Sequence, residues 1–129
     1  MKSALKILLL LVLLIAANGC GGARFDNKLA QEKRELGELY DWYLNYAKSH
    51  ESPPADLSQA DEDEITNSAG LRAVKDGKYT VVWNLKTRDA ATILAYEPAA
   101  PTQGGIVLLA NGAVRKMTAD EFKRAKPAS

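Results

Sequence analysis

The sequence has one cysteine, one histidine and no apolar run long enough to span a bilayer. A single cysteine excludes an internal disulfide, and one cysteine with one histidine cannot supply the paired ligands of a zinc module. A spanning helix needs roughly 20 apolar residues, whereas the longest run here extends only from Ile7 to Ala17. This run is therefore too short to remain as a membrane anchor.

An excess of charge of one sign is also missing, because the chain has 17 Lys and Arg residues against 16 Asp and Glu residues. The basic residues are scattered among carboxylates and form no basic stripe, so we expect no nucleic-acid partner.

Familiar catalytic motifs are absent too. The sequence contains no HExxH, no GxSxG and no glycine-rich loop that could hold a phosphate. His50 is expected at the end of a helix, where it interacts with the helix dipole rather than with a nucleophile. We therefore expect a non-catalytic protein without a metal or other cofactor. A pair of carboxylates that meet in space, as in a glycosidase, stays open as an alternative.

Residues 1–20 have the layout of a secretory signal peptide. Lys2 and Lys6 precede the apolar run, and small or polar residues lead to Cys20. This arrangement resembles the lipobox of bacterial lipoproteins, whose signal peptidase cuts before a cysteine that carries diacylglycerol. It departs from the commonest pattern at Ala17 and Asn18.

The resemblance implies removal of residues 1–19 and attachment to a membrane through lipidated Cys20. Two or more acyl chains give stable attachment where a single chain does not. The protein would then face the periplasm, and a residue other than Asp after the cysteine, here Gly21, implies the outer membrane. The alternative is an ordinary cleaved signal that leaves a free thiol.

Cleavage before Cys20 leaves 110 of the 129 residues, a length that suits one domain with a hydrophobic core. We expect residues 20–26 to be a lipidated flexible spacer and residues 27–126 to be a single α+β domain.

The domain is predicted to begin with an amphipathic helix that runs from Asn27, its N-cap, to about His50. Pro53 and Pro54 then prevent its continuation. Apolar residues recur at helical spacing on one broad face: Leu29, Leu36, Leu39, Tyr40, Tyr43, Tyr46 and Ala47.

Several aromatic residues of this helix follow one another closely: Tyr40, Trp42, Tyr43 and Tyr46. Such a stripe either belongs to the core or forms a surface for a sugar or a lipid. Trp42 lies at the edge of the apolar face and should be partly exposed. Trp42 and Tyr46 are therefore the candidate partner surface.

The stretch from Glu51 to Ala60 favours turns or one short helix. The acidic run Asp61 to Glu64 is expected at the start of the next helix, where the dipole favours carboxylates. A Ca²⁺ site is the alternative, although the spacing is not that of an EF-hand. This helix should pass through Ile65, Leu71 and Val74 and end at Asp76-Gly77.

Two strands are predicted next, from Lys78 to Leu85 and from Ala91 to Tyr96, paired as neighbours. In the first, Tyr79, Val81, Trp83 and Leu85 share one face. Pro98 and Pro101 predict a loop that ends at Gly104-Gly105, and Ile106 to Leu109 reads as an interior strand.

Asn111-Gly112 predicts a type I′ turn, which joins Ile106–Ala110 to Ala113–Met117 in a hairpin with Leu109 opposite Val114 and Ile106 opposite Met117. Thr118 and Glu121 form a predicted capping box at the start of a short helix. Phe122 of that helix should pack on the sheet, and residues 126–129 should fray.

These elements predict an α+β fold with a long N-terminal amphipathic helix packed on an antiparallel sheet of about four strands, followed by a short C-terminal helix. The segments from Gly105 to Val114 and from Met117 to Phe122 resemble the C-terminal part of pilin-like and pseudopilin-like proteins, where a strand, a turn, a second strand and a short helix follow one another. The chain is thus similar to small bacterial lipoproteins with a pilin-like domain. Asn111 stands where such proteins have Asp, and the expected loss of the leader removes the helix by which pilins assemble.

The expected function is that of a lipid-anchored, periplasmic, non-catalytic interaction or structural module. One alternative is a ligand-binding or inhibitor lipoprotein that uses Trp42 and the loop from Glu97 to Gly105. Another is an accessory subunit of a pilus or a type II secretion-like machine. The sequence names neither the protein partner nor the oligomeric state.

Overall fold

The computed structural model of the protein describes residues 27–125. The predicted leader, Cys20, the spacer 20–26 and the predicted frayed end 126–129 lie outside these residues. The chain divides into two compact units, Met1–Gln31 and Glu32–Ser129. All of the sheet and all of the shorter helices belong to the second unit.

A long helix covers residues 27–50 and ends at His50, as predicted. Glu51 adopts a φ of 57°, and this left-handed conformation stops the helix just before Pro53. Asn27 is itself helical, so the prediction that it is an N-cap is wrong. Within the second unit the helix buries Leu36, Leu39 and Tyr43.

Three short helices follow the long one. Leu57–Gln59 is a single 3-10 turn (η1) that Asp56 caps, in accord with the predicted turn or short helix. The helix predicted through Ile65 and Val74 is divided into α2, Glu62–Asn67, and α3, Ala69–Lys75.

The division of this helix lies at Ser68, which is extended, with φ −116° and ψ 117°. Its hydroxyl accepts a hydrogen bond from the amide of Leu71 at 3.2 Å and so caps α3. The amide of Gly70 in turn donates to the carboxylate of Glu38 on the long helix at 3.1 Å. The prediction of one continuous helix is wrong because these bonds turn the chain toward the long helix. Its predicted end holds, since Asp76 is the C-cap and Gly77 has a φ of 79°.

The sheet has four antiparallel strands in the order β1-β2-β3-β4. Their bounds are Thr80–Val81 (β1), Ile93–Tyr96 (β2), Gly105–Leu109 (β3) and Val114–Met117 (β4). The fold is therefore the predicted α+β arrangement of a long helix, four antiparallel strands and a short C-terminal helix. β1 and β2 are neighbours, and β3 is interior, as predicted.

Strand β1 is much shorter than the predicted Lys78–Leu85. A tyrosine hydroxyl from the long helix explains the difference. Tyr43 Oη donates to the carbonyl of Val82 at 3.0 Å and accepts from the amide of Leu85 at 2.9 Å. The chain then turns at Asn84, which has a φ of 60°. Side-chain hydrogen bonds thus replace part of the strand ladder that the alternating pattern suggests.

The β3-β4 hairpin has a register one residue away from the predicted one. Leu108 lies opposite Val114 and Gly105 lies opposite Met117. The carbonyl of Leu109 accepts from the amide of Gly112 at 2.9 Å, and the amide of Leu109 donates to Ala113 at 2.8 Å. Between Leu109 and Ala113 only Gly112 has a positive φ, of 94°.

The loop therefore holds three residues, 110–112, rather than the two of a type I′ turn. Gly112 closes it as a bulge, which is the other common solution for short hairpins. Asn111 contributes through its side chain, because Oδ1 accepts from the amide of Ala113 at 3.1 Å. One additional loop residue is enough to shift every pair of the hairpin by one.

The region of Pro101 is not a plain loop, because Ala100–Gln103 forms one helical turn, α4. Proline is tolerated in a first turn since the amide there needs no intrahelical partner. The C-terminal helix α5, Ala119–Arg124, begins with the predicted capping box of Thr118 and Glu121.

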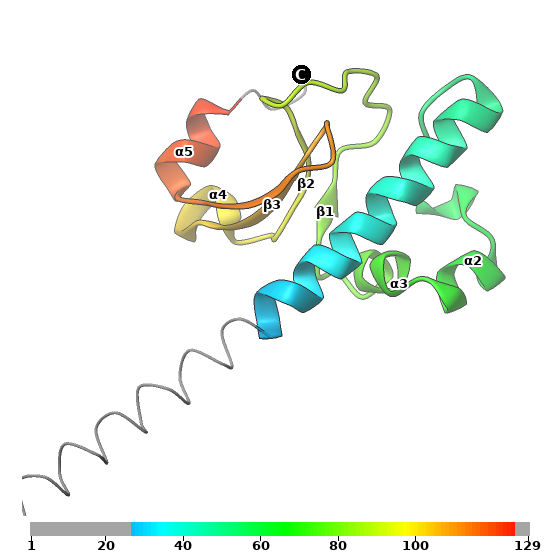
Figure 1. Ribbon diagram of the computed structural model, residues 1–129, viewed down its shortest axis with the longest axis horizontal. Helices are drawn as coiled ribbons and strands as arrows, with labels where there is room; N and C mark the ends of the chain where they lie inside the picture. The colour runs from blue at the N-terminus through cyan, green and yellow to red at the C-terminus, as the bar shows by residue number, and fades with distance from the viewer. Residues whose placement is uncertain (1–26, 126–129) are drawn as a thin grey trace, which may run out of the picture. The chain divides into compact units, whose positions relative to one another are not determined.

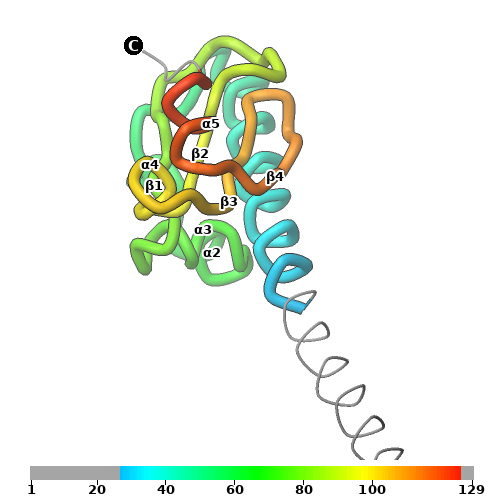
Figure 2. Tube along the Cα trace, turned by 90° about the vertical axis from the view of Figure 1, so that its left-hand side faces the viewer, coloured from blue at the N-terminus to red at the C-terminus, as the bar shows by residue number. Residues whose placement is uncertain are grey.

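Two layers cover the sheet. Figures 1 and 2 both place the long helix along one side of it and α4 with α5 along the other. Phe122 packs on the second side, as predicted, at 4.9 Å from the ring of Tyr96. The buried cluster there consists of Ile93, Ala100, Val107, Leu109 and Met117. Burial of each of its large apolar side chains stabilises the fold by about 1.5 to 3 kcal/mol.

Among residues 27–125, no helix is both long and apolar enough to cross a membrane.

Candidate functional site

An aromatic surface forms where the C-terminal half of the long helix meets the turn after β1. We define it by Trp42, Tyr46 and His50 of the helix and Trp83 of the turn. The three helix residues are four apart and therefore follow one another along one side of the helix. Trp42, Tyr46 and Trp83 are half-buried and His50 is exposed, which bears out the prediction that Trp42 is partly exposed.

The rings of this surface contact one another in series. Trp42 and Tyr46 have ring centroids 5.7 Å apart, and Tyr46 stacks on His50 at 3.9 Å. Trp83 meets Trp42 edge-on, at 6.4 Å and an angle of 87°. Both geometries are favourable for aromatic pairs, each of which is worth about 0.5 to 1.5 kcal/mol beyond its buried area.

Tyr43 lies beneath the aromatic surface and packs against Trp83. Its ring is buried and stacks on Trp83 with centroids 6.2 Å apart. Burial raises the pKa of the Tyr43 hydroxyl, in spite of the hydrogen bond from the Leu85 amide. The neutral hydroxyl can then both donate to Val82 and accept from Leu85, and these bonds hold the turn that carries Trp83. Of the predicted aromatic stripe, Tyr43 thus belongs to the core.

A carboxylate from α2 borders the aromatic surface. Trp42 Nε1 donates to Glu64 Oε2 at 3.1 Å. Glu64 is held there by a capping box: its amide donates to Asp61 at 2.7 Å, and its carboxylate accepts from the Asp61 amide at 3.3 Å. The acidic run therefore begins a helix, as predicted, and also presents one carboxylate to a tryptophan.

The described residues offer no metal site. No group of three or more His, Cys, Asp or Glu side chains in residues 27–125 is arranged to hold an ion. His50 Nδ1 lies 3.0 Å from the carbonyl oxygen of Tyr46, one turn earlier in the helix. This is the position expected for a group that interacts with the C-terminal end of the helix dipole.

A second polar cluster lies in the core, beneath the long helix. The carboxylate of Glu35, 6% exposed, accepts from Lys78 Nζ at 2.7 Å and from Tyr79 Oη at 2.7 Å. Glu32, one turn earlier in the helix, is only 1% exposed. The cluster joins the helix to the chain that leads into β1.

Burial and the neighbouring carboxylates both favour the protonated hydroxyl of Tyr79. Burial raises the pKa of Tyr79 far above its ordinary value, and the hydrogen bond to Glu35 raises it further. The negative charges of Glu35, Glu32 and Glu97 act in the same direction. A protonated Tyr79 can donate to Glu35, and this hydrogen bond joins the long helix to the chain before β1.

The other predicted site residues have structural positions. Gly112 packs its backbone against Tyr40, since a Cβ there would lie 2.9 Å from the ring of Tyr40. Thr118 and Glu121 cap α5, and the hydrogen bond from the Thr118 amide lowers the pKa of Glu121, as does Arg115 3.0 Å away. The lipidation site Cys20 lies outside the described residues.

Reasoning from the sequence identified Trp42 and Tyr46 but missed Trp83 and Glu64 as their neighbours. Trp83 alternates with Val81, which predicts that it shares a face with Val81 on a strand that in fact ends before it. The buried carboxylates of Glu32 and Glu35 were also missed. The available signal was their spacing. Glu32 and Glu35 are three residues apart, as are Leu36 and Leu39, and this spacing places the two carboxylates beside the apolar face of the helix.

No protein-family model, curated protein or solved structure matches the chain.

Proposed function

We propose that the protein is a lipid-anchored, non-catalytic interaction module of the bacterial cell envelope, held in the membrane through Cys20 and facing the periplasm. The observation that carries this proposal is the leader, with two lysines, an apolar run of limited length and a cysteine at the expected cleavage position. A lipid on this cysteine would supply the membrane attachment that the short apolar run cannot.

The folded part supports a binding role through its partly exposed aromatic surface. Its polar clusters serve packing and capping, as with Glu35 beneath the long helix and Asp61 at the start of α2. The aromatic surface, by contrast, leaves Trp42, Tyr46 and Trp83 partly open to solvent. Tryptophan and tyrosine in such positions are typical of protein interfaces.

Metabolic labelling with an alkyne analogue of palmitate tests the anchor. We expect the full chain to be labelled and to fractionate with membranes. A Cys20→Ala variant should be unlabelled. Comparison of envelope fractions should then place the labelled protein with the outer membrane, because Gly21 follows the cysteine.

Ser49→Ala, at an exposed position of the long helix, serves as the control and should be labelled like the unmodified chain. Equal labelling of the Cys20→Ala variant and the unmodified chain would refute the anchor. So would a mature protein in which mass spectrometry finds a free thiol at position 20.

A further inference from the structure

We infer that the aromatic surface docks a positively charged segment of a partner protein, one that presents arginine or lysine side chains to Trp42 and Trp83. The inference deepens the proposed function, on which it rests, because it assigns the contact face of the module and the chemistry of its partner.

The first ground is the geometry of the two tryptophans. Their rings meet at 87° with centroids 6.4 Å apart, so the two ring faces point in different directions at one place on the surface. Both side chains keep part of their area in contact with solvent. The face of an indole ring attracts a cation within about 6 Å, and it does so more strongly than tyrosine or phenylalanine.

The second ground is the charge of the helical segments that build and border this surface, which outweighs that of the turn carrying Trp83, where Lys86 and Arg88 stand against Asp89. Between Asp41 and Asn67 the chain carries seven acidic residues and a single lysine, Lys48. All seven carboxylates are exposed, namely Asp41, Glu51, Asp56, Asp61, Glu62, Asp63 and Glu64. Glu64 directly contacts the aromatic surface through its hydrogen bond from Trp42.

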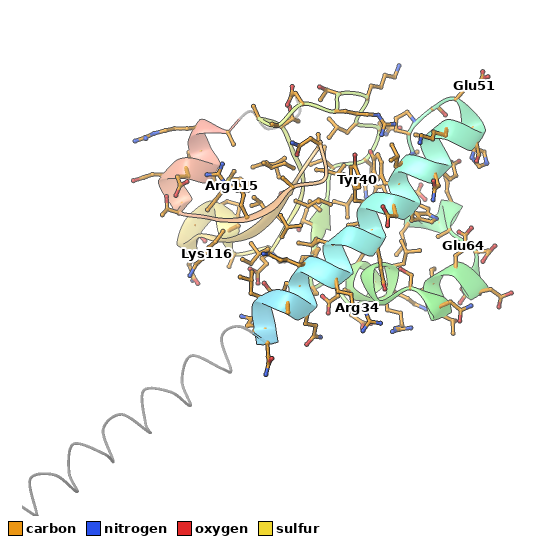
Figure 3. The ribbon with its side chains drawn as sticks, in the orientation of Figure 1. Arg34, Tyr40, Glu51, Glu64, Arg115 and Lys116 are labelled. Atoms are coloured by element: carbon orange, nitrogen blue, oxygen red, sulfur yellow. The ribbon has the colours of Figure 1, made fainter. Side chains whose placement is uncertain are left out.

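The acidic segments lie apart from the two cations of β4, Arg115 and Lys116 (Figure 3). Glu51 and Glu64 lie toward one end of the domain, whereas Arg115 and Lys116 lie toward the other (Figure 3). A concentration of one sign at one end steers oppositely charged partners to that end. An anionic ligand, such as a phosphate group or an acidic polysaccharide, would be repelled from the aromatic surface.

Arginine and lysine side chains can interact with both the tryptophan ring faces and the carboxylates. Their charged groups are attracted by the carboxylates and by the ring faces, and their aliphatic stems can lie against the exposed parts of Tyr46 and Trp83. A neutral sugar chain would use the ring faces and could donate hydroxyl hydrogen bonds to individual carboxylates, but it would gain no long-range attraction from their negative charge.

The test is a titration of the purified full chain, kept in nonionic detergent, with a capped oligoarginine peptide. Both tryptophans of the chain lie in the aromatic surface, so their fluorescence reports directly on binding. We expect oligoarginine to change the emission, an oligoglutamate of equal length to have no effect, and added salt to weaken the binding.

Two matched variants locate the site. Asp63 and Asp120 are each the second residue of a short helix that starts with a capping box, so Asp63→Asn and Asp120→Asn remove the same charge from equivalent positions. We expect Asp63→Asn to raise the Kd for oligoarginine by about two- to fivefold, the range of a partly screened surface charge pair. Asp120→Asn, on α5, should leave the Kd unchanged. Trp42→Leu, followed by calorimetry, should weaken binding by a similar factor.

Several results would overturn the inference. Equal Kd values for the two Asn variants would mean that oligoarginine binds elsewhere. A change of emission with an N-acetylglucosamine oligomer but not with oligoarginine would make the surface a sugar site. Salt-sensitive self-association that oligoarginine cannot disperse would identify a second copy of the chain as the occupant. No response to any probe would assign the rings to packing alone.

The binding assay uses purified protein, so its result does not depend on labelling at Cys20. If the unmodified chain is not labelled but binds oligoarginine, only the anchor is refuted. If it is labelled but does not bind oligoarginine, only the docking surface is refuted.

Discussion

Gly70→Ala is expected to destabilise the protein strongly because α3 packs backbone to backbone against the long helix at this residue. A Cβ at position 70 would lie 2.2 Å from the carbonyl oxygen of Glu35 and 2.8 Å from the amide nitrogen of Leu39. Both contacts are with main-chain atoms of a helix, so no rotamer change can relieve them. One of the two helices must move.

The expected size follows from two opposing effects. Alanine in a helix is favoured over glycine by about 1 kcal/mol. Overpacking in a well-packed core costs about 1 to 3 kcal/mol, and occasionally more, and contacts this short with backbone belong at the upper end. The shift would also disturb the hydrogen bond from the Gly70 amide to Glu38. We expect a net loss of about 2 kcal/mol or more in the free energy of unfolding.

Gly37→Ala is the matched control, since it makes the same substitution in the long helix. A Cβ at position 37 would have no neighbour within 4 Å. This variant should gain up to about 1 kcal/mol from helix propensity alone. The two glycine variants should therefore differ in sign.

Urea unfolding followed by circular dichroism measures both variants, and an unchanged m-value indicates that the substitution altered stability and not the surface exposed on unfolding. Thermal unfolding provides a second measurement, in which 1 kcal/mol corresponds to about 4 to 8 °C for a domain of this size. A Gly70→Ala variant as stable as the unmodified chain would refute the close approach of the two helices.

Two further substitutions test the buried cluster and the C-terminal cap. Tyr79→Phe removes the 2.7 Å hydrogen bond to Glu35 and should cost about 1 to 3 kcal/mol at neutral pH, because a buried carboxylate loses a donor. The pKa of Tyr79 in the folded protein is above its ordinary value of 10.0, so the stabilisation is complete below pH 10 and is lost as the pH rises toward the folded value. Urea unfolding across this range should show a smaller alkaline loss for Tyr79→Phe than for Tyr96→Phe, and parallel pH profiles would contradict the assignment. Thr118→Ala removes the bond from the Glu121 amide to the Thr118 hydroxyl, 3.1 Å long, and should cost about 1 kcal/mol. Thr66→Ala, at an exposed position inside α2, is its control in the same assay, and equal effects of the two threonine variants would argue against the cap.

The features that could be predicted from the sequence depend on residues near one another in the chain. Thr118 and Glu121 are three residues apart, so their capping box forms wherever the chain goes next. Local residues also predict where two helices end, namely the long helix at His50 and α3 at Asp76-Gly77. Alternation and a continuous apolar run identified β3 as interior and β1 and β2 as neighbours. Trp42 was identified as half-exposed from its angle on the helix alone.

Other features were decided by residues that meet only in the folded chain. The Tyr43 hydroxyl forms hydrogen bonds with the backbone of Val82 and Leu85, about 40 positions away in the chain. These bonds end β1 early. Gly70 allows α3 to approach the long helix, and the turn at Ser68 follows from that contact. In the hairpin, the tip at Gly112 packs on Tyr40 with a three-residue loop, although Asn111-Gly112 equally suits the shorter turn.

The candidate site divides in the same way. Trp42 and Tyr46 could be placed together because helical spacing is a local property. Trp83 and Glu64 joined them only through packing, Trp83 from a turn held by Tyr43 and Glu64 from the first turn of α2. The sequence by itself determined the end of the long helix, the C-terminal end of α3 and the capping box of α5, since these depend on local spacing. Tertiary structure decided the hairpin register, the length of β1 and the neighbours of Trp42, because each depends on a contact between residues far apart in the chain.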